Sequence, residues 1–180
     1  NAYVVMDAKT GQVLLQKNMY EKEYPASITK ILTTALGLTY AKPEDRITVS
    51  QETVSNVWKW GETTHLALEP GEIITLKDAL YGAMVESAND CANAIAQAVS
   101  GSLTDFAELM NQQVAALGLS DTHFTNAHGL PDKDHYTTAY DMARITRWAM
   151  TVPGFEEYFC ATEYTIPKTN KKDVARNIGT

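Results

Sequence analysis

The chain has 180 residues, of which 44% are hydrophobic and 21% are charged, and its formal net charge at pH 7 is −7. This length corresponds to about one domain, and the composition is typical of a folded protein with a substantial core. The acidic balance argues against a nucleic-acid partner, because the longest basic run that could contact phosphates is Lys171-Lys172. No run of about 18 apolar residues is present, so the sequence predicts no membrane-spanning helix.

The N-terminus predicts a β-hairpin. Short β-type runs at residues 3–7 and 13–15 are separated by a polar turn, in which Gly11 stands at the position that needs a positive φ. The tripeptide Lys-Thr-Gly at residues 9–11 falls on this turn, and we interpret it as turn chemistry.

A helix that begins just after Pro25 carries a serine and a lysine in its first turn. Apolar residues recur at helical spacing from residue 28 to residue 36, and the helix is predicted to end near Tyr40. Because residues three apart on a helix are neighbours, the Ser27 hydroxyl and the Lys30 amine can come within hydrogen-bond distance. A lysine with a lowered pKa can activate a serine nucleophile, and the positive end of the helix dipole would stabilise the developing negative charge. The alternative is that Ser27 only caps the helix.

The middle of the chain is predicted to be mainly helical. Thr75 and Asp78 resemble a capping box, and Ser102 and Thr138 are further start signals. Helices are predicted at residues 75–84, 91–99, 102–117 and 138–150. Short alternating segments at 47–49 and 64–68 are of β type, and the chain looks extended from residue 164.

These elements predict an α+β fold with an antiparallel sheet, packed helices and a mainly helical insertion. We divide the domain into a hairpin and serine helix at 1–46, a helical subdomain at 47–150, and a connection back toward the sheet at 151–180. Two short strands make only a marginal sheet, so we expect the complete domain to need C-terminal strands that this chain lacks.

A second polar cluster lies at the break between two predicted helices, at Ser87-Ala88-Asn89. Side chains at such a break can point into a cleft, where Ser87 could relay a proton between Lys30 and a leaving amine. Asn89 could hold a substrate amide and orient Lys30. The alternative is that Ser87 and Asn89 merely cap the following helix.

The order and setting of residues 27–30 (Ser-Ile-Thr-Lys) and 87–89 (Ser-Ala-Asn) resemble the penicillin-binding protein and serine β-lactamase superfamily. Within it the chain is similar to the low-molecular-mass D-alanyl-D-alanine carboxypeptidases. Further similar segments are residues 7–11, 123–131 and 136–143. The resemblance implies a β-lactamase/transpeptidase-like fold along nearly the whole chain.

The resemblance also implies roles for four side chains. Ser27 would attack the carbonyl between the two terminal D-alanines of a peptidoglycan stem peptide, with Lys30 as the base. Ser87 would pass a proton to the departing amine, and Asn89 would bind the peptide. β-Lactams would acylate Ser27, and no cofactor is implied. The family is exported, so the activity would lie on the cell-wall side of the bacterial membrane.

One departure from the family pattern concerns its third motif, Lys-Thr-Gly or a close variant on a later strand. Residues 168–170 read Lys-Thr-Asn and lack the glycine, so we interpret them as part of the connection leading to that strand. We therefore expect a truncated chain or a proteolytic fragment. The helix after Ser27 would leave apolar surface and strand edges open, which predicts self-association, strand exchange or a companion polypeptide.

Two other functions are compatible with the motifs. A serine β-lactamase shares the serine and the lysine, but Ala88 stands where class A enzymes have an aspartate, and no acidic residue has a context suited to fast deacylation. A non-catalytic peptidoglycan- or β-lactam-binding module is the alternative outside enzymes, because the Lys-Thr-Gly strand is absent.

The histidines and cysteines are the remaining residues that could bind a metal ion or form a disulfide. His123, His128 and His135 lie close together in a loop with several aspartates, but their spacing matches no metal-binding motif, and we predict no metal site. Cys91 falls in an apolar helical run, so a buried free thiol is favoured over a disulfide with Cys160.

Overall fold

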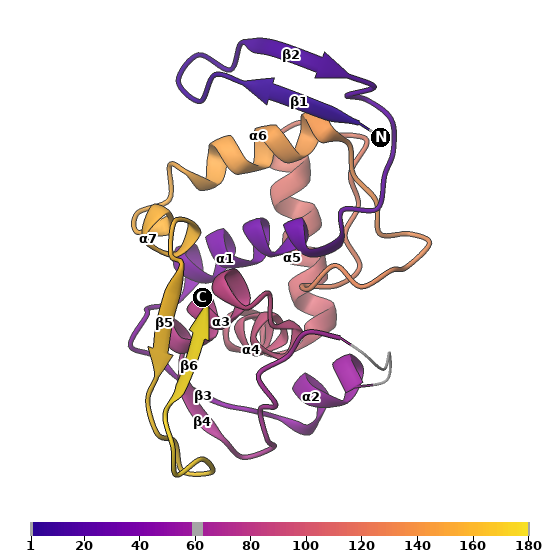
Figure 1. The fold of residues 1–180 in the computed structure, drawn as a ribbon. Helices are drawn as coiled ribbons and strands as arrows, with labels where there is room; N and C mark the ends of the chain where they lie inside the picture. Colours follow the sequence, from indigo (N-terminus) through magenta and orange to yellow (C-terminus); the bar gives the residue numbers. More distant parts are fainter. Residues whose placement is uncertain (1, 59–62, 180) are drawn as a thin grey trace.

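The computed structural model describes residues 2–58 and 63–179 (Figure 1). Its elements follow one another as β1 (Tyr3–Met6), β2 (Val13–Lys17), the 3-10 helix η1 (Ala26–Ile28), α1 (Thr29–Tyr40), β3 (Arg46–Thr48), α2 (Gln51–Trp58), β4 (Ile73–Thr75), α3 (Leu76–Val85), α4 (Asn89–Ser100), α5 (Leu103–Ala116), α6 (Ala139–Ala149), α7 (Phe155–Phe159), β5 (Glu163–Ile166) and β6 (Arg176–Gly179). In the described ranges, no helix has the length and apolar character needed to cross a bilayer.

The strands within the described residues form three separate antiparallel pairs, β1 with β2, β3 with β4, and β5 with β6. Helices fill the space between these pairs, so the predicted α+β class is confirmed. Figure 1 shows the β1–β2 hairpin on the outer side of α6 and the β5–β6 hairpin beside α3 and α7. The division of the chain at residues 46 and 150 stays a prediction.

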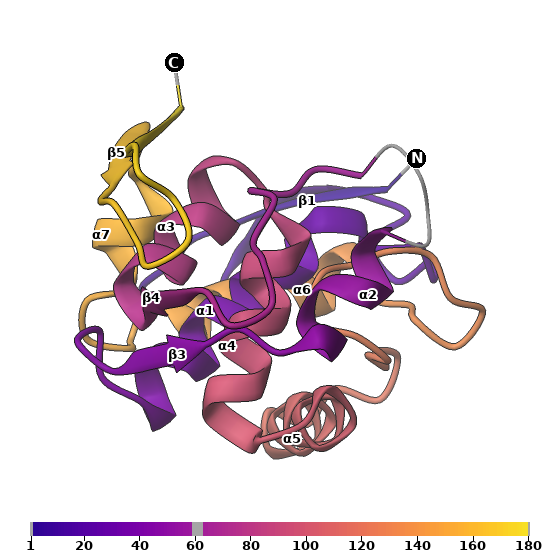
Figure 2. The same cartoon turned by 90° about the horizontal axis from the view of Figure 1, so that it is seen from below.

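Helix α1 lies at the centre of the molecule, with α6 on one side and α3 and α4 on the other (Figures 1 and 2). Leu32 and Leu36 are fully buried in one apolar cluster with Phe106 and Met110 of α5. Gly37 lets α4 approach closely, because a Cβ there would lie 2.9 Å from a methyl carbon of Ile95. The expectation that α1 leaves its apolar face open is therefore wrong, since helices of this same chain cover it.

The turn of the N-terminal hairpin is fixed by local hydrogen bonds and by α6. The Asp7 carboxylate accepts from the backbone N–H and the hydroxyl of Thr10, at 2.6 and 2.8 Å, and Gly11 has a φ of +76°. Arg147 of α6 donates to the backbone carbonyls of Ala8 and Lys9. The interpretation of residues 9–11 as turn chemistry is confirmed.

The predicted helix start signals are confirmed. Thr75 and Asp78 form a reciprocal capping box at the start of α3, and the hydroxyls of Ser102 and Thr138 each accept from a backbone N–H in the first turn of α5 and α6. The prediction of a β-type segment at 64–68 is wrong. There the N–H groups of Leu66 and Leu68 bond to a carboxylate instead of a neighbouring strand.

The C-terminal hairpin packs on α3 through aromatic and aliphatic side chains. Tyr164 of β5 stacks on Tyr81 of α3 with ring centroids 3.9 Å apart, and Ile166 and Ile178 are buried. The loop between β5 and β6 contains residues 168–170, as predicted, and it is tied to the β3–β4 region by hydrogen bonds.

A buried ion pair joins this loop region to the turn before β4. The Glu72 carboxylate is fully buried and accepts from Arg176 at 2.6 Å and from the Thr169 hydroxyl at 3.0 Å. Arg176 also donates to the carbonyl of Leu66 at 3.3 Å. The C-terminal hairpin therefore contacts the 64–68 segment as well as α3.

Candidate active site

The serine of the first motif lies in a tight turn immediately before α1. Pro25 has a φ of −68°, and Ala26 then takes the left-handed conformation with a φ of +51°. Ser27 follows in the 3-10 helix η1 and is exposed, whereas Lys30 in the first turn of α1 is 2% exposed. The predicted neighbours are therefore an accessible hydroxyl and a buried amine.

The Lys30 amine lies within hydrogen-bond distance of four oxygens. Its Nζ is 2.7 Å from Asn89 Oδ1 and 2.8 Å from the backbone carbonyl of His128. It is 3.4 Å from the hydroxyls of both Ser27 and Ser87. The structure thus brings together all four residues that the sequence singled out, although they come from η1, from α1, from the α3–α4 junction and from the start of α4.

These distances define the direction of the lone pair of Lys30 when the amine is neutral. A neutral amine has two N–H groups, and the two short contacts are to carbonyl-type oxygens that can only accept. The lone pair then points toward the two hydroxyls, which are able to donate. With Asn89 and His128 taking its two N–H groups, a neutral Lys30 is able to accept a proton from one of these hydroxyls.

The surroundings of Lys30 make its amine easier to deprotonate than that of an exposed lysine. Burial lowers the pKa of the amine to about 8, and the Coulombic effects of Cys91 and Asp90 oppose that shift. Burial also raises the pKa of the Cys91 thiol well above its usual range, so this group is uncharged near neutral pH. Of these two neighbours, the Asp90 carboxylate is therefore the one that can offer a negative charge to the Lys30 amine.

Ser87 and Asn89 lie where α3 ends and α4 begins. Ser87 has a φ of +57°, a left-handed conformation that is strained for a residue with a Cβ. Helix α4 begins at Asn89, two residues before the predicted start at Cys91, and its N-cap is Ala88, which makes no side-chain cap bond. The alternative that Ser87 and Asn89 serve only as caps is therefore wrong, because the Asn89 carboxamide and the Ser87 hydroxyl face Lys30.

Two residues of the loop between α5 and α6 belong to the site but were not identified as such from the sequence. The carbonyl of His128 accepts from Lys30, and the backbone of Gly129 lies against Ala26. A Cβ on Gly129 would be 1.8 Å from the Ala26 carbonyl oxygen, and Gly129 has a φ of +91°. The sequence signals were the similarity of residues 123–131 to the family and the glycine itself, since a contact through a backbone carbonyl leaves no mark on residue type.

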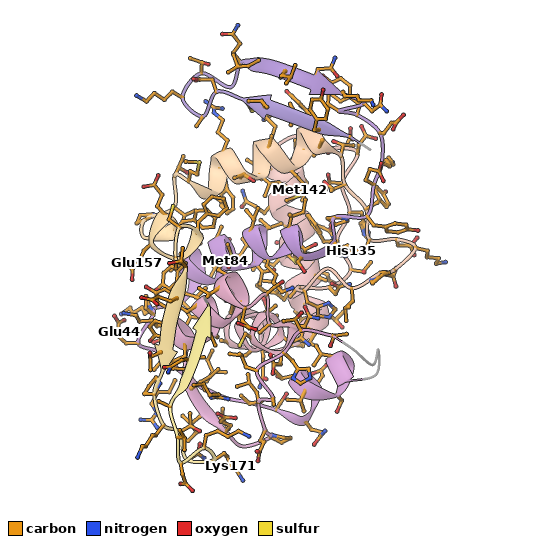
Figure 3. All side chains as sticks on the ribbon, in the orientation of Figure 1. Glu44, Met84, His135, Met142, Glu157 and Lys171 are labelled. Carbon is orange, nitrogen blue, oxygen red and sulfur yellow. The ribbon has the colours of Figure 1, made fainter. Side chains whose placement is uncertain are left out.

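His135 supports the first turn of α1 from the same loop (Figure 3). Its Nδ1 accepts from the backbone N–H of Thr125 at 3.0 Å, so the ring proton lies on Nε2, which donates to the Thr29 hydroxyl at 2.9 Å. Burial lowers the pKa of His135 to about 4 and that of His128 to about 3, so both imidazoles are neutral at neutral pH.

The histidines of this loop are used in hydrogen bonds within the protein. His123 contacts the carbonyl of Asp134, and His128 Nδ1 accepts from the N–H of Leu130. Within residues 2–58 and 63–179, no three His, Cys, Asp or Glu side chains are grouped to hold a metal ion. Cys91 is buried, Cys160 is exposed, and both are free thiols, as the sequence indicated.

The site combines an exposed serine, a buried lysine beside it and a second serine. These are the side chains that acyl transfer through a covalent intermediate requires. The family model described as D-alanyl-D-alanine carboxypeptidase matches residues 1–179. The chain belongs to the D-alanyl-D-alanine carboxypeptidase family. This membership confirms the resemblance found in the motifs and favours that family over the β-lactamase alternative.

Individual relatives agree with this assignment. The chain is 35% identical over 175 residues to the D-alanyl-D-alanine carboxypeptidase DacF of Bacillus subtilis, covering 94% of this chain and 44% of the relative. It is 29% identical over 178 residues to DacB2 of Mycobacterium tuberculosis, covering 97% and 59%. The chain therefore spans about half the length of these relatives, 44% of one and 59% of the other.

Solved structures show the same fold. The D-alanyl-D-alanine carboxypeptidase DacD from Francisella tularensis superimposes with a TM-score of 0.83 at 30% identity, covering 91% of this chain and 40% of that one. Penicillin binding protein 6B from Escherichia coli gives a TM-score of 0.86 at 28% identity, covering 96% and 57%. The penicillin-binding fold expected from the motifs is therefore confirmed.

Proposed function

We propose that the protein is a serine-type D-Ala-D-Ala carboxypeptidase that removes the terminal D-alanine from peptidoglycan stem peptides. The observation that carries the proposal is the pair of short contacts from Lys30 Nζ to Asn89 and His128, at 2.7 and 2.8 Å. They leave the lone pair of the neutral amine directed at the Ser27 hydroxyl, and family membership supplies the substrate class.

In the proposed reaction, Lys30 takes the proton of the Ser27 hydroxyl while Ser27 Oγ bonds to the carbonyl carbon between the two D-alanines. The negative charge on the carbonyl oxygen develops at the N-terminal end of α1, where backbone N–H groups and the helix dipole stabilise it. The C–N bond then breaks, and Ser87 passes a proton from Lys30 to the departing amine. Water cleaves the acyl-Ser27 ester and regenerates the hydroxyl.

The proposal is tested by incubating the protein with benzylpenicillin, measuring the intact mass and mapping the modified peptide. We expect a stable adduct on Ser27, because a β-lactam carbonyl reacts as the peptide carbonyl does but its leaving group stays attached. The Ser27→Ala variant should show no adduct, and the exposed control Ser120→Ala should react like the wild type. An unmodified, folded wild-type protein would contradict the proposal.

A second assay separates the enzyme from the alternatives. Release of D-alanine from a peptide ending in D-Ala-D-Ala supports the carboxypeptidase. Rapid turnover of the penicillin, with no lasting adduct, would instead identify a β-lactamase. A folded protein that binds the peptide without releasing D-alanine would be the non-catalytic binding module.

Location and assembly form part of the proposal. We propose that the protein acts outside the cytoplasmic membrane, because peptidoglycan lies there and the family's relatives are penicillin-binding proteins of the cell wall. We also propose that the chain self-associates through the outer face of the β1–β2 hairpin. Tyr3, Val5 and Leu15 lie on that face and are about half exposed, which leaves an apolar patch beside open strand edges.

A further inference from the structure

Asp90 follows Asn89 directly, and its carboxylate is fully buried beside the site. It accepts hydrogen bonds from the backbone N–H groups of Leu66 at 3.1 Å, Leu68 at 3.0 Å and Cys91 at 2.9 Å. Among the ion pairs formed by the described residues, none includes Asp90. A buried carboxylate is costly, so one satisfied only by backbone donors indicates a specific role.

The first consequence of these bonds is the shape of the 64–68 segment. Its N–H groups at Leu66 and Leu68 point to one carboxylate, and Ala67 between them is left-handed with a φ of +50°. The backbone N–H of Asn89 donates to the carbonyl of Thr64 at 2.9 Å. Two consecutive residues at the start of α4 therefore tie this segment to the helix that presents Asn89 to Lys30.

The second consequence is electrostatic. Lys30 is buried, and its amine interacts with Asp90 and Cys91 of α4 and with His128 of the loop between α5 and α6. Cys91 and His128 are uncharged near neutral pH, so Asp90 supplies the negative charge among these three. Two other buried acids on helices that surround α1 bond elsewhere. Asp78 of α3 accepts from Tyr164, and Asp141 of α6 accepts from Thr122. The Glu157 carboxylate of α7 accepts from Tyr81.

We propose that Asp90 is a positioning residue for the proposed acyl-transfer reaction: its carboxylate holds the 64–68 segment against the start of α4 and provides a negative charge that opposes the effect of burial on Lys30. The electrostatic half rests on Lys30 acting as the base. Without the counter-charge, burial alone would act on the amine, and Lys30 would lose its proton at a lower pH.

The test measures Lys30 directly, by an NMR titration of protein labelled with 13C at lysine Cε. The Lys30 signal is assigned by its absence from Lys30→Arg. We expect the wild type to titrate near pH 8. In Asp90→Asn, which nearly preserves the shape of the side chain, the midpoint should fall by up to about one pH unit.

The matched control is Asp78→Asn, because Asp78 is also a buried carboxylate in the first turn of a helix but bonds to Thr75 and Tyr164. This variant should lose stability without moving the Lys30 midpoint. A folded Asp90→Asn protein with an unchanged midpoint would overturn the electrostatic role. The NMR titration does not require acylation, so its outcome is independent of whether the penicillin assay succeeds.

The structural role is tested on the wild type by amide hydrogen exchange, which decides the question even where Asp90→Asn does not fold. The amides of Leu66 and Leu68 should exchange slowly, although they lie in a segment without regular secondary structure. Exchange of both amides at the rate of an open loop would contradict the tie to Asp90.

Discussion

At the scale of single residues, the chemistry of the site depends on the protonation of one amine. Lys30 can accept the Ser27 proton only when neutral, and burial lowers its pKa to about 8. Below this pH the neutral fraction falls about tenfold per pH unit, and above it the fraction levels off. In the proposed mechanism, the pH range that supports acylation therefore follows the pKa of Lys30, which burial lowers and nearby negative charge raises.

We therefore predict that the rate constant for acylation of Ser27 by benzylpenicillin rises with pH up to about 8 and then becomes constant. Stopped-flow or quenched mass measurements between pH 6 and about 9.5 would record the profile. Lys30→Arg should abolish acylation, because a guanidinium keeps its proton. The exposed Lys17→Arg should leave the profile unchanged, and a flat wild-type profile would show that Lys30 is not the base.

Gly129 gives a second prediction at this scale, since its backbone lies against the carbonyl of Ala26. The Gly129→Ala variant would have a Cβ 1.8 Å from that oxygen, so the turn that carries Ser27 must shift. We expect acylation to fall at least about tenfold, because misplacement by about 1 Å already costs that much or more. The variant should also lose more than the ~1–2 kcal/mol expected for a left-handed alanine alone.

Gly101→Ala is the control for backbone strain. Gly101 also has a positive φ, of +78°, but no atom lies within 4 Å of the position of its added Cβ. Chemical denaturation should show the smaller loss of unfolding free energy for this variant, and acylation should be normal. Equal losses in the two variants would mean that close packing against Ala26 does not matter.

At the scale of elements, the C-terminal hairpin is attached to the rest of the molecule by the buried pair between Glu72 and Arg176. Removing one member of a buried ion pair leaves the other charge unpaired, which typically costs about 3–5 kcal/mol. We predict that Glu72→Gln lowers the free energy of unfolding by an amount of this order. Urea denaturation measures it, and hydrogen exchange should show faster opening of β5 and β6.

The control for this prediction is Glu69→Gln. Glu69 pairs with Lys172 on the surface of the same region, and exposed pairs contribute little to stability. This variant should therefore unfold nearly as the wild type does. If Glu72→Gln is equally mild, the hairpin is attached mainly by its apolar contacts with α3.

At the scale of the whole molecule, the exposed apolar face of the N-terminal hairpin is the basis of the proposed self-association. We predict that the protein associates with itself as its concentration rises, and that Leu15→Lys weakens the association by placing a charge in the patch. Sedimentation velocity at several concentrations would measure it. Val174→Lys changes an apolar residue that is more exposed than Leu15, 73% against 57%, but lies away from the hairpin, and it should have no effect. A monodisperse wild-type monomer at every concentration would contradict the prediction.

Local signals in the sequence predicted much of this architecture. Gly11 marked the hairpin turn, and Thr75, Ser102 and Thr138 marked helix starts, because capping depends on residues only three apart. The helices α2 and α7 lacked such clear signals, and the alternation at 64–68 pointed to a strand. Among the described residues that segment pairs with no strand, because its N–H groups bond to the Asp90 side chain, 22 to 24 residues along the chain.

The sequence by itself determined which side chains lie together through their spacing along one helix. These are the serine and the lysine of the first motif. The break between two predicted helices pointed to Ser87 and Asn89, and the family resemblance implied their roles. Only the tertiary structure decided that Lys30 is buried, that the His128 carbonyl orients it, and that Gly129 lies against the turn of the nucleophile. The physical reason is that burial and backbone contacts depend on segments about 100 residues apart meeting in space, and neither depends on the local residue pattern.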